Sequence, residues 1–257
     1  MAIELPDLHE VVHLLKQKPD LPKGRLLILG SANVHVSREQ YQSLLQGYQF
    51  DPVMIPEVLT PFSLGESLGF QTTETLDVNG EATITHNLME AVPVDLYEKY
   101  DLIIDAGVLF WCFNPGLALE NILRMLKHGG DVLHITAVSG FYGRGYYNIH
   151  PKTLDDFYKV NGCQFLFASY RSRLFRSSLL RRALNRICGF LGHRLAAMAY
   201  SRSGSFGQVY FCEISPQHYA FLERPPEMTP QFVPNDIIGV FAFRKELHVM
   251  PVSPVLI

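Results

Sequence analysis

The stretch that decides the fold runs from Tyr100 to Gly130 and reads YDLIIDAGVLFWCFNPGLALENILRMLKHGG. Its first part, Leu102 to Ile104, is short and apolar, as is typical of a strand covered on both faces. Asn114, with a proline directly after it, predicts the start of a helix, and the closing Gly-Gly pair predicts its end. One face of that helix is apolar, through Leu119, Ile122, Leu123 and Leu126. Because another apolar run, Asp131 to Val138, follows at once, the stretch predicts a strand–helix–strand unit with parallel strands.

The rest of the chain continues this alternation of strands and helices. Six further segments are predicted as strands: Arg25 to Gly30, Thr72 to Asp77, Glu81 to His86, Gln164 to Tyr170, Gln208 to Ile214 and Ile237 to Arg244. Three further helices are predicted: Leu8 to Gln17, Arg38 to Leu45 after a Ser37–Gln40 capping box, and one capped by Thr153 with Asp156 that stops at Asn161. Residues 51–70 hold three prolines and predict a loop or short helices. The chain is therefore an α/β protein.

Two arrangements are open for residues 72–86. The dipeptide Asn79-Gly80 lies between two threonine-rich alternating runs, which is a good signal for a hairpin. Separate parallel strands agree better with the alternation on either side, and we favour them.

Composition limits the class of protein. The chain has 257 residues, of which 47% are hydrophobic and 18% charged, and we expect a single domain over 1–257. The net charge of −3 argues against a nucleic-acid binder with a global basic field. The four cysteines are scattered, which disfavours a disulfide framework or a metal cage and indicates a reducing cytoplasm. No run reaches the ~18 to 20 apolar residues of a membrane span, and the acidic N-terminal turns do not resemble a signal peptide.

Two late segments are expected to depart from the alternation. Residues 171–206 predict a helical insertion with apolar residues at helical spacing and arginines on its other faces. A packed helix with a solvated basic face is the favoured interpretation; a lid over the pocket and a docking face for an acidic partner remain open. Residues 245–257 form an apolar tail that packs on the body or on a partner subunit, so a homodimer is compatible with the sequence.

The turn after the first long strand bears on the ligand. A dinucleotide site needs three glycines near this turn, but Gly30 is followed by Ser31 without a second glycine, which disfavours NAD and FAD. A ligand with an adenosine but no pyrophosphate demands less of the turn. It still needs an acid at the end of the next strand for its ribose hydroxyls, and Asp77 stands there. A solvated turn residue is an equally good interpretation of Asp77.

Four segments together resemble class I S-adenosylmethionine-dependent methyltransferases, and most closely the bacterial small-molecule and sugar-type domains. They are Leu76-Asp77 with the following EATITHNL, Tyr100 to Gly107, Leu126 to His134, and Gly143 to Pro151 with Phe157-Tyr158 and Asn161-Gly162. The resemblance covers residues ~20 to 170. It implies a Rossmann-like, doubly wound, seven-stranded and mostly parallel sheet.

The resemblance also implies a cofactor, S-adenosylmethionine, and residues to bind it. Gly30 and Ser31 would lie near its methionine part, Asp77 on the ribose, Asn87 and Leu88 beside the adenine, and Asp105 and Gly107 under the sulfonium. The sequence departs from the family pattern at several points. The gap from Gly30 to Asp77 is more than twice the ~20 residues of a compact dinucleotide unit. Asn87 replaces the usual acid, and Phe110-Trp111 stand where such enzymes often have Glu-His.

The acceptor side can be assigned only as hypotheses. Phe110, Trp111, Tyr142, Arg144 and Tyr146 could line the acceptor site, or could serve only packing and solvation. His150 and Tyr147 are the catalytic candidates, with His86 as a further base; a bond to nearby backbone is the ordinary alternative for His150. The leading hypothesis is a small-molecule methyltransferase. The alternatives are a non-catalytic binding or scaffold protein on the same fold and, less favoured, an NAD-linked oxidoreductase.

Overall fold

The computed structural model describes residues 2–31, 33–141, 144–172, 237–248 and 250–254. A seven-stranded sheet runs through the described part in the spatial order β5, β4, β2, β6, β7, β9, β8. Its strands are β2 (Arg25–Leu29), β4 (Thr72–Asp77), β5 (Ile84–Thr85), β6 (Tyr100–Asp105), β7 (Leu126–Ser139), β8 (Cys163–Ser172) and β9 (Ile237–Lys245). A separate parallel pair joins β1 (Ala2–Ile3) to β3 (Asn33–Val34). The fold is the Rossmann-like, doubly wound and mostly parallel sheet that the sequence predicts.

Strand directions settle the question left open for residues 72–86. β4 and β5 pair in parallel, with Leu76 opposite Ile84, which confirms separate strands and excludes a hairpin at Asn79-Gly80. β5 is much shorter than the predicted strand from Glu81. Before it, Thr83 is bound to Thr75 through side-chain and backbone hydrogen bonds of 2.7 to 3.1 Å. β9 is antiparallel to both of its neighbours, β7 and β8.

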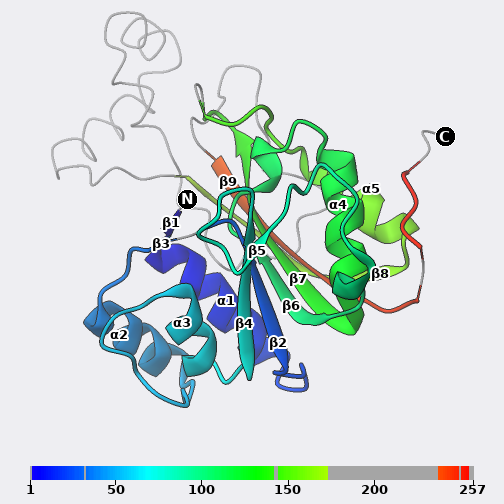
Figure 1. Ribbon diagram of the computed structural model, residues 1–257. Coiled ribbons are helices and arrows are strands. Elements are labelled where there is room, and N and C mark those ends of the chain that lie inside the picture. Colours follow the sequence, from blue (N-terminus) through cyan, green and yellow to red (C-terminus); the bar gives the residue numbers. More distant parts are fainter. Residues whose placement is uncertain (1, 32, 142–143, 173–236, 249, 255–257) are drawn as a thin grey trace, which may run out of the picture.

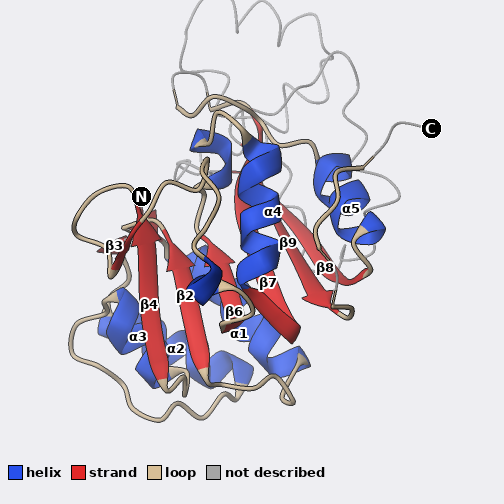
Figure 2. Cartoon of the chain, turned by 45° about the vertical axis from the view of Figure 1, so that its right-hand side comes forward, coloured by secondary structure: helices blue, strands red, loops and turns tan. Residues whose placement is uncertain are grey.

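Helices cover both faces of the sheet, as Figures 1 and 2 show. One face carries α1 (Leu5–Gln17), α2 (Arg38–Tyr48) and α3 (Pro61–Ser67), and the other carries α4 (Pro115–Met125) and α5 (Pro151–Val160). All six residues of β6 are buried, because this central strand is covered from both sides. Each face has its own apolar core, and the two cores meet only through the sheet.

The helix starts show which sequence signals were correct. The Ser37–Gln40 capping box of α2 and the Asn114 cap of α4 are confirmed. The prediction that Thr153 caps α5 was wrong: the helix begins at Pro151, and His150 caps it by accepting a hydrogen bond from the Lys152 amide. Proline is favoured in the first helical turn, where its missing N–H is not needed. α1 also begins earlier than predicted, because Glu4 and Asp7 form a reciprocal cap.

The end of α4 differs from the prediction, and a buried lysine of the C-terminal strand binds beside it. α4 ends at Met125, and β7 begins directly at Leu126, so the Gly-Gly pair lies within the strand and does not end the helix. Lys245 at the end of β9 is buried, and its ammonium donates to the carbonyl oxygens of Leu123 and Leu126 at 3.1 and 2.8 Å. A buried charge of this kind is tolerated because it is hydrogen-bonded.

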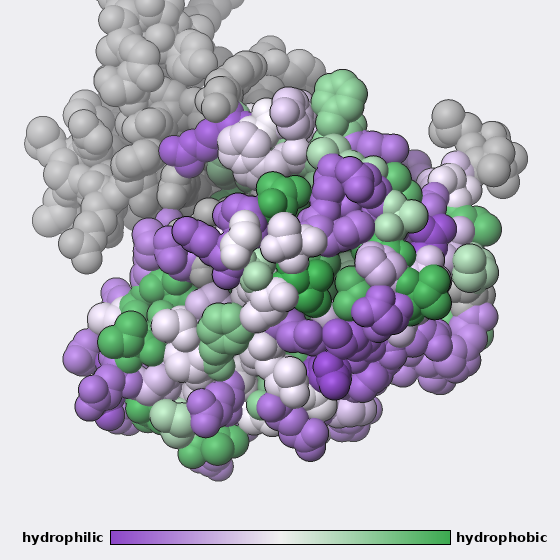
Figure 3. All heavy atoms as spheres, in the orientation of Figure 1, coloured by the Kyte–Doolittle hydropathy of each residue, from purple (hydrophilic) through white to green (hydrophobic). Residues whose placement is uncertain are grey.

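The C-terminal tail is hydrogen-bonded to the body of the protein, but its apolar side chains at Leu247, Met250 and Val252 are 50 to 70% exposed and do not pack into a core. The backbone of Val252 exchanges two hydrogen bonds with the Asn161 side chain, at 2.8 and 2.9 Å. The predicted strand Gln208 to Ile214 and nearly all of the predicted 171–206 insertion lie outside the described residues. On the face drawn in Figure 3, apolar and polar side chains of the described residues are interspersed. In the described part of the chain, no helix is long and apolar enough to cross a membrane.

Candidate functional site

A cavity lies at the carboxyl ends of the parallel strands. Its volume is about 550 Å³, and residues at or just after the ends of β4, β5, β6 and β7 line it. The chain runs outward from β2 in both directions, to β4 and β5 on one side and to β6 and β7 on the other. The crevice where the strand order reverses is the usual ligand site of an open α/β sheet. This cavity occupies that position.

Asp77 lies in the lining of the cavity, at the end of β4. Its Oδ2 accepts a hydrogen bond from the Ser31 amide at 2.6 Å, and its Oδ1 accepts from the amides of Val78 and Asn79 at 2.6 and 3.4 Å. Partial burial alone would raise the pKa of Asp77, but these hydrogen bonds outweigh it and hold the pKa below its ordinary value. A carboxylate has about four lone-pair sites. The three amides take three of these sites, and the Ser31 side chain also stabilises the charged carboxylate.

Gly30 and Ser31 act on the cavity through Asp77. Neither residue is part of the lining. Gly30 has φ 88°, in the left-handed region that favours glycine, and its amide donates to the Leu76 carbonyl at 2.7 Å. The turn thereby brings the Ser31 amide onto Asp77, while the Ser31 hydroxyl donates to Asn79 at 2.7 Å. The turn at Gly30 and Ser31 therefore positions the Asp77 carboxylate.

Asn87, Leu88 and Met89 form a wall of the cavity next to Asp77. The Asn87 side chain stays close to its own loop, accepting from the Met89 amide at 3.0 Å and donating to Glu90 at 3.3 Å. Leu88 is buried and presents an apolar surface. His86 also lines this end, with its ring 3.3 Å from the Glu90 carbonyl.

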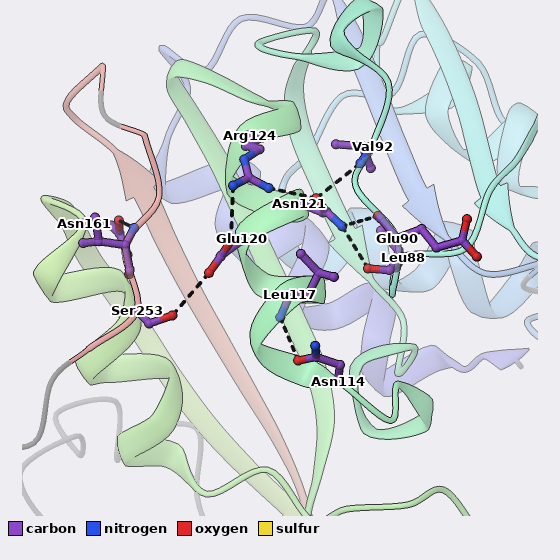
Figure 4. A network of polar contacts seen from close by, with 11 residues as sticks. Leu88, Glu90, Val92, Asn114, Leu117, Glu120, Asn121, Arg124, Asn161 and Ser253 are labelled. Atoms are coloured by element: carbon purple, nitrogen blue, oxygen red, sulfur yellow. Dashed lines mark hydrogen bonds and ion pairs between the residues drawn. The ribbon is translucent and has the colours of Figure 1, made fainter.

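A buried asparagine of α4 holds this wall in place, as Figure 4 shows. The Asn121 amide nitrogen donates to the carbonyl oxygens of Leu88 and Glu90, at 2.9 and 2.7 Å, and Arg124 donates to its oxygen at 3.2 Å. The side chain is fully buried. The sequence analysis missed Asn121. The available signal was an amide inside the apolar stripe of a helix, where a polar group is kept only if its hydrogen bonds are made.

Asp105 and Gly107 have different positions, although both lie at the end of β6. Gly107 lines the cavity and has φ 87°. Asp105 is fully buried and lies outside the lining: one of its oxygens accepts from the backbone amides of Gly107, Val108 and Leu109, at 2.6 to 3.3 Å. Of the two residues expected under the sulfonium, Gly107 therefore lines the cavity and Asp105 does not. The Asp105 carboxylate instead shapes the turn that forms the floor.

The far end of the cavity is aromatic. Phe110, Trp111 and Phe141 line it, with the Phe110 ring 5.7 Å from that of Trp111 and 5.9 Å from that of Phe141, measured between centroids. Arg144 lies at the same end. Cys112 also lines it, and burial raises the pKa of its thiol to about 12. The thiol is therefore neutral at ordinary pH and is no nucleophile.

The structure does not bring the two predicted catalytic residues to the cavity. His150 is exposed and caps α5 through its Nδ1, which is the ordinary alternative that the sequence left open. Tyr147 is 41% exposed and donates its hydroxyl to the Phe113 carbonyl at 3.2 Å. Tyr146 is also exposed and outside the lining, and Tyr142 lies outside the described residues. Two carboxylates that the sequence analysis did not single out, Glu4 and Asp7, do line the cavity.

The sheet order, together with a cavity at its switch point that has an acidic and an aromatic end, defines a doubly wound α/β protein with a ligand site at its carboxyl edge. No protein-family model and no curated protein matches the chain. Solved structures of S-adenosylmethionine-dependent methyltransferases do resemble it over most of its length.

Three of them illustrate the likeness. The methyltransferase of Archaeoglobus fulgidus is 11% identical with a TM-score of 0.41, over 92% of this chain and 94% of that one. The 1,6-didemethyltoxoflavin N1-methyltransferase of Burkholderia thailandensis, with its substrate and S-adenosylhomocysteine bound, is 11% identical with a TM-score of 0.42, over 92% and 76%. The phosphoethanolamine N-methyltransferase 2 of Haemonchus contortus, bound to phosphomonomethylethanolamine and S-adenosylhomocysteine, is 14% identical with a TM-score of 0.40, over 91% and 52%. At these identities and scores we base no assignment on them.

Proposed function

We propose that the protein is an S-adenosylmethionine-dependent methyltransferase that transfers a methyl group in line to a small-molecule acceptor. The observation that carries the proposal is the position of Asp77, a carboxylate whose pKa is held below its ordinary value, in a cavity at the switch point of a doubly wound sheet. A hydrogen-bond acceptor at this place suits the hydroxyls of a ribose. The apolar wall of Leu88 and Met89 beside it suits a purine ring.

The residues present fit the cofactor in a specific division of roles. Asp77 would hold the ribose, Asn87 and Leu88 would border the adenine, and Gly107 would lie under the methionine part, where the absence of a side chain leaves room. Gly30 and Ser31 would contribute by fixing Asp77. S-adenosylmethionine supplies a methyl group on a positively charged sulfur.

The acceptor end supports a reaction that depends on alignment. Phe110, Trp111 and Arg144 would hold and orient the acceptor, and the surrounding apolar wall would exclude water. Well-oriented intramolecular reactions gain roughly 7 to 11 kcal/mol from position alone. A general base adds only ~10² to 10⁴ in rate. We therefore propose a reaction that does not depend on His150 or Tyr147.

Binding of S-adenosylhomocysteine, measured by calorimetry, tests the proposal. We expect saturable binding to the wild-type chain. Asp77→Asn should weaken the affinity about tenfold to a hundredfold, the range for a hydrogen bond to a charged group. Asp51→Asn, at an exposed aspartate on another loop, is the matched control and should bind like wild type. Absence of heat at millimolar ligand, with a folded protein, would refute the cofactor assignment.

A binding or scaffold protein without a cofactor is the second candidate. The turn at Gly30 favours this candidate, because the backbone amides of Ser31, Val78 and Asn79 already donate to the Asp77 carboxylate. Few acceptor sites of the carboxylate are then left for a ribose. The same titration separates the two candidates. The proposal further assigns the enzyme to the cytoplasm and allows a homodimer, which sedimentation velocity would detect.

A further inference from the structure

Exposed aromatic rings continue from the aromatic end of the cavity to the protein surface. Outside the lining, Phe113 is 67% exposed and Tyr146 62% exposed, and Trp111 is itself 46% exposed although it lines the cavity. The Phe113 ring lies edge-on to Tyr146 with centroids 5.6 Å apart, and 6.3 Å from Tyr147. We refer to Phe110, Trp111, Phe113, Phe141, Tyr146 and Tyr147 as the aromatic track.

The track is built from two loops that the backbone ties together. One follows β6 and the other follows β7, so they leave neighbouring strands of the sheet. The amides of Tyr146 and Tyr147 both donate to the Phe110 carbonyl, at 2.8 and 3.3 Å. Gly145 permits this approach: its φ is 69°, and a Cβ there would lie 2.8 Å from the Phe110 carbonyl oxygen. The rings are therefore held in place by backbone contacts.

The gathering of these exposed rings beside the cavity indicates a binding surface. A soluble protein scatters single apolar residues over its surface, whereas apolar side chains gathered beside a cavity mark a binding site. The occupant has to be continuous with the ligand in the cavity, because Trp111 belongs both to the lining and to the exposed rings. The walls beside it, Ala137 and Ile238, are also apolar.

We propose that the acceptor is an extended molecule with an apolar, ring-bearing part, and that this part lies on the aromatic track while the reacting end enters the cavity beside Phe110. This inference rests on the proposed function, whose acceptor class it names. A sugar is the alternative ring-shaped ligand, but it needs many polar partners. The Tyr147 hydroxyl on the track already donates to the Phe113 carbonyl, and the side chains that line this end of the cavity, Arg144 apart, are mostly apolar.

The single tryptophan of the chain, Trp111, makes the track directly observable. The probe is 8-anilinonaphthalene-1-sulfonate, which has apolar rings and accepts excitation energy from tryptophan. We expect saturable sensitised emission of the probe. Phe113→Ala and Tyr146→Ala should each raise its dissociation constant about two- to tenfold, the range for loss of one aromatic contact. The matched control is Phe62→Ala, at a phenylalanine on α3 that is 46% exposed and should leave the titration unchanged.

Four outcomes would overturn the proposal, the last of which concerns S-adenosylhomocysteine. One is the absence of energy transfer from Trp111; another is an equal loss of affinity in Phe62→Ala; the third is displacement of the probe by excess methyl glucoside, which would favour a sugar. Circular dichroism of each variant checks that it is folded. S-adenosylhomocysteine should leave the probe bound, because it occupies the Asp77 end. Failure of this ligand to bind would refute the proposed function without affecting the probe titration, whereas displacement of the probe by it would refute the track assignment.

Discussion

Asp105 and His134 form a fully buried pair, with Oδ2 of Asp105 2.8 Å from Nδ1 of His134. The other ring nitrogen of His134 lies 2.7 Å from the Tyr158 hydroxyl, which is also fully buried. Burial raises the pKa of Tyr158 well above its ordinary value, so its hydroxyl keeps its proton. The His134 ring thus bridges the Asp105 carboxyl group and the Tyr158 hydroxyl. This chain of bonds fixes the turn that carries Gly107 beneath the cavity.

Asp105→Ala should lower the free energy of unfolding by about 3 to 5 kcal/mol, as is usual when a buried charged network loses one member. The three backbone amides after β6 and the His134 ring lose their acceptor together. Tyr158→Phe removes one hydrogen bond at the far end and should cost only about 1 kcal/mol. Urea unfolding measures both. Equal costs would show that Asp105 does not organise the turn.

Asn121→Asp should loosen the wall of the cavity formed by residues 87–92. The substitution keeps the shape but replaces the donor to the Leu88 and Glu90 carbonyls by an oxygen, at a cost of about 1 to 3 kcal/mol. Amide hydrogen exchange should accelerate in this loop, and S-adenosylhomocysteine should bind more weakly. The control variant Glu66→Gln, at an exposed residue of α3, should change neither. Unchanged exchange in Asn121→Asp would contradict the positioning role.

Alkylation by iodoacetamide at pH 8 should spare Cys112 and Cys163 in the native protein. Burial raises the pKa of both thiols to about 12. At pH 8 the thiolate fraction is then roughly 10⁻⁴, so reaction should be at least ~10³-fold slower than for a free cysteine of pKa ≈ 8.5. Peptide mapping after timed labelling, with urea-denatured protein as the reference, gives the rates. Rapid labelling of Cys112 would show that its thiol is accessible and not buried.

Glu10→Gln should stabilise the protein at neutral pH. Burial raises the pKa of Glu10, while the hydrogen bond from Ser169 opposes the shift only partly, and Oε2 has no partner among the described residues. The pKa of Glu10 is therefore higher in the folded than in the unfolded state. At pH values between these two pKa values, the folded state binds more protons than the unfolded state. The contribution of Glu10 to stability is therefore greatest below about 4.5 and is lost as pH rises.

The variant should gain about 0.5 to 1.5 kcal/mol at pH 7 to 8, and should show little difference from wild type at pH 4. Thermal unfolding at the two pH values measures the contrast. The introduced amide can still accept the hydrogen bond from Ser169, so a loss of stability at pH 7 would mean that the charge of Glu10 is used by a partner.

Local signals predicted the elements but not the directions of their side chains. Asn114 and Ser37 cap helices as predicted, because a cap depends on a few neighbouring residues. Asp77 reached the cavity because the carboxyl ends of parallel strands meet at one edge. The sequence pattern places His150 near the same edge as well, but in the structure its side chain caps α5. Pro151, directly after it, could have indicated that a helix begins there.

The sequence by itself determined the alternation of strands and helices and the place of the site, since buried runs, caps and strand ends are read within short windows. The doubly wound class followed from the resemblance of four segments to a known family. Only the tertiary structure decided that β4 and β5 are parallel and that β9 is antiparallel. It also decided that Asp105 turns inward to His134 while Gly107 faces the cavity, and that Asn121 holds the loop of Leu88. These outcomes depend on residues far apart in the chain, because hydrogen-bond partners for a buried polar group exist only once the elements have packed.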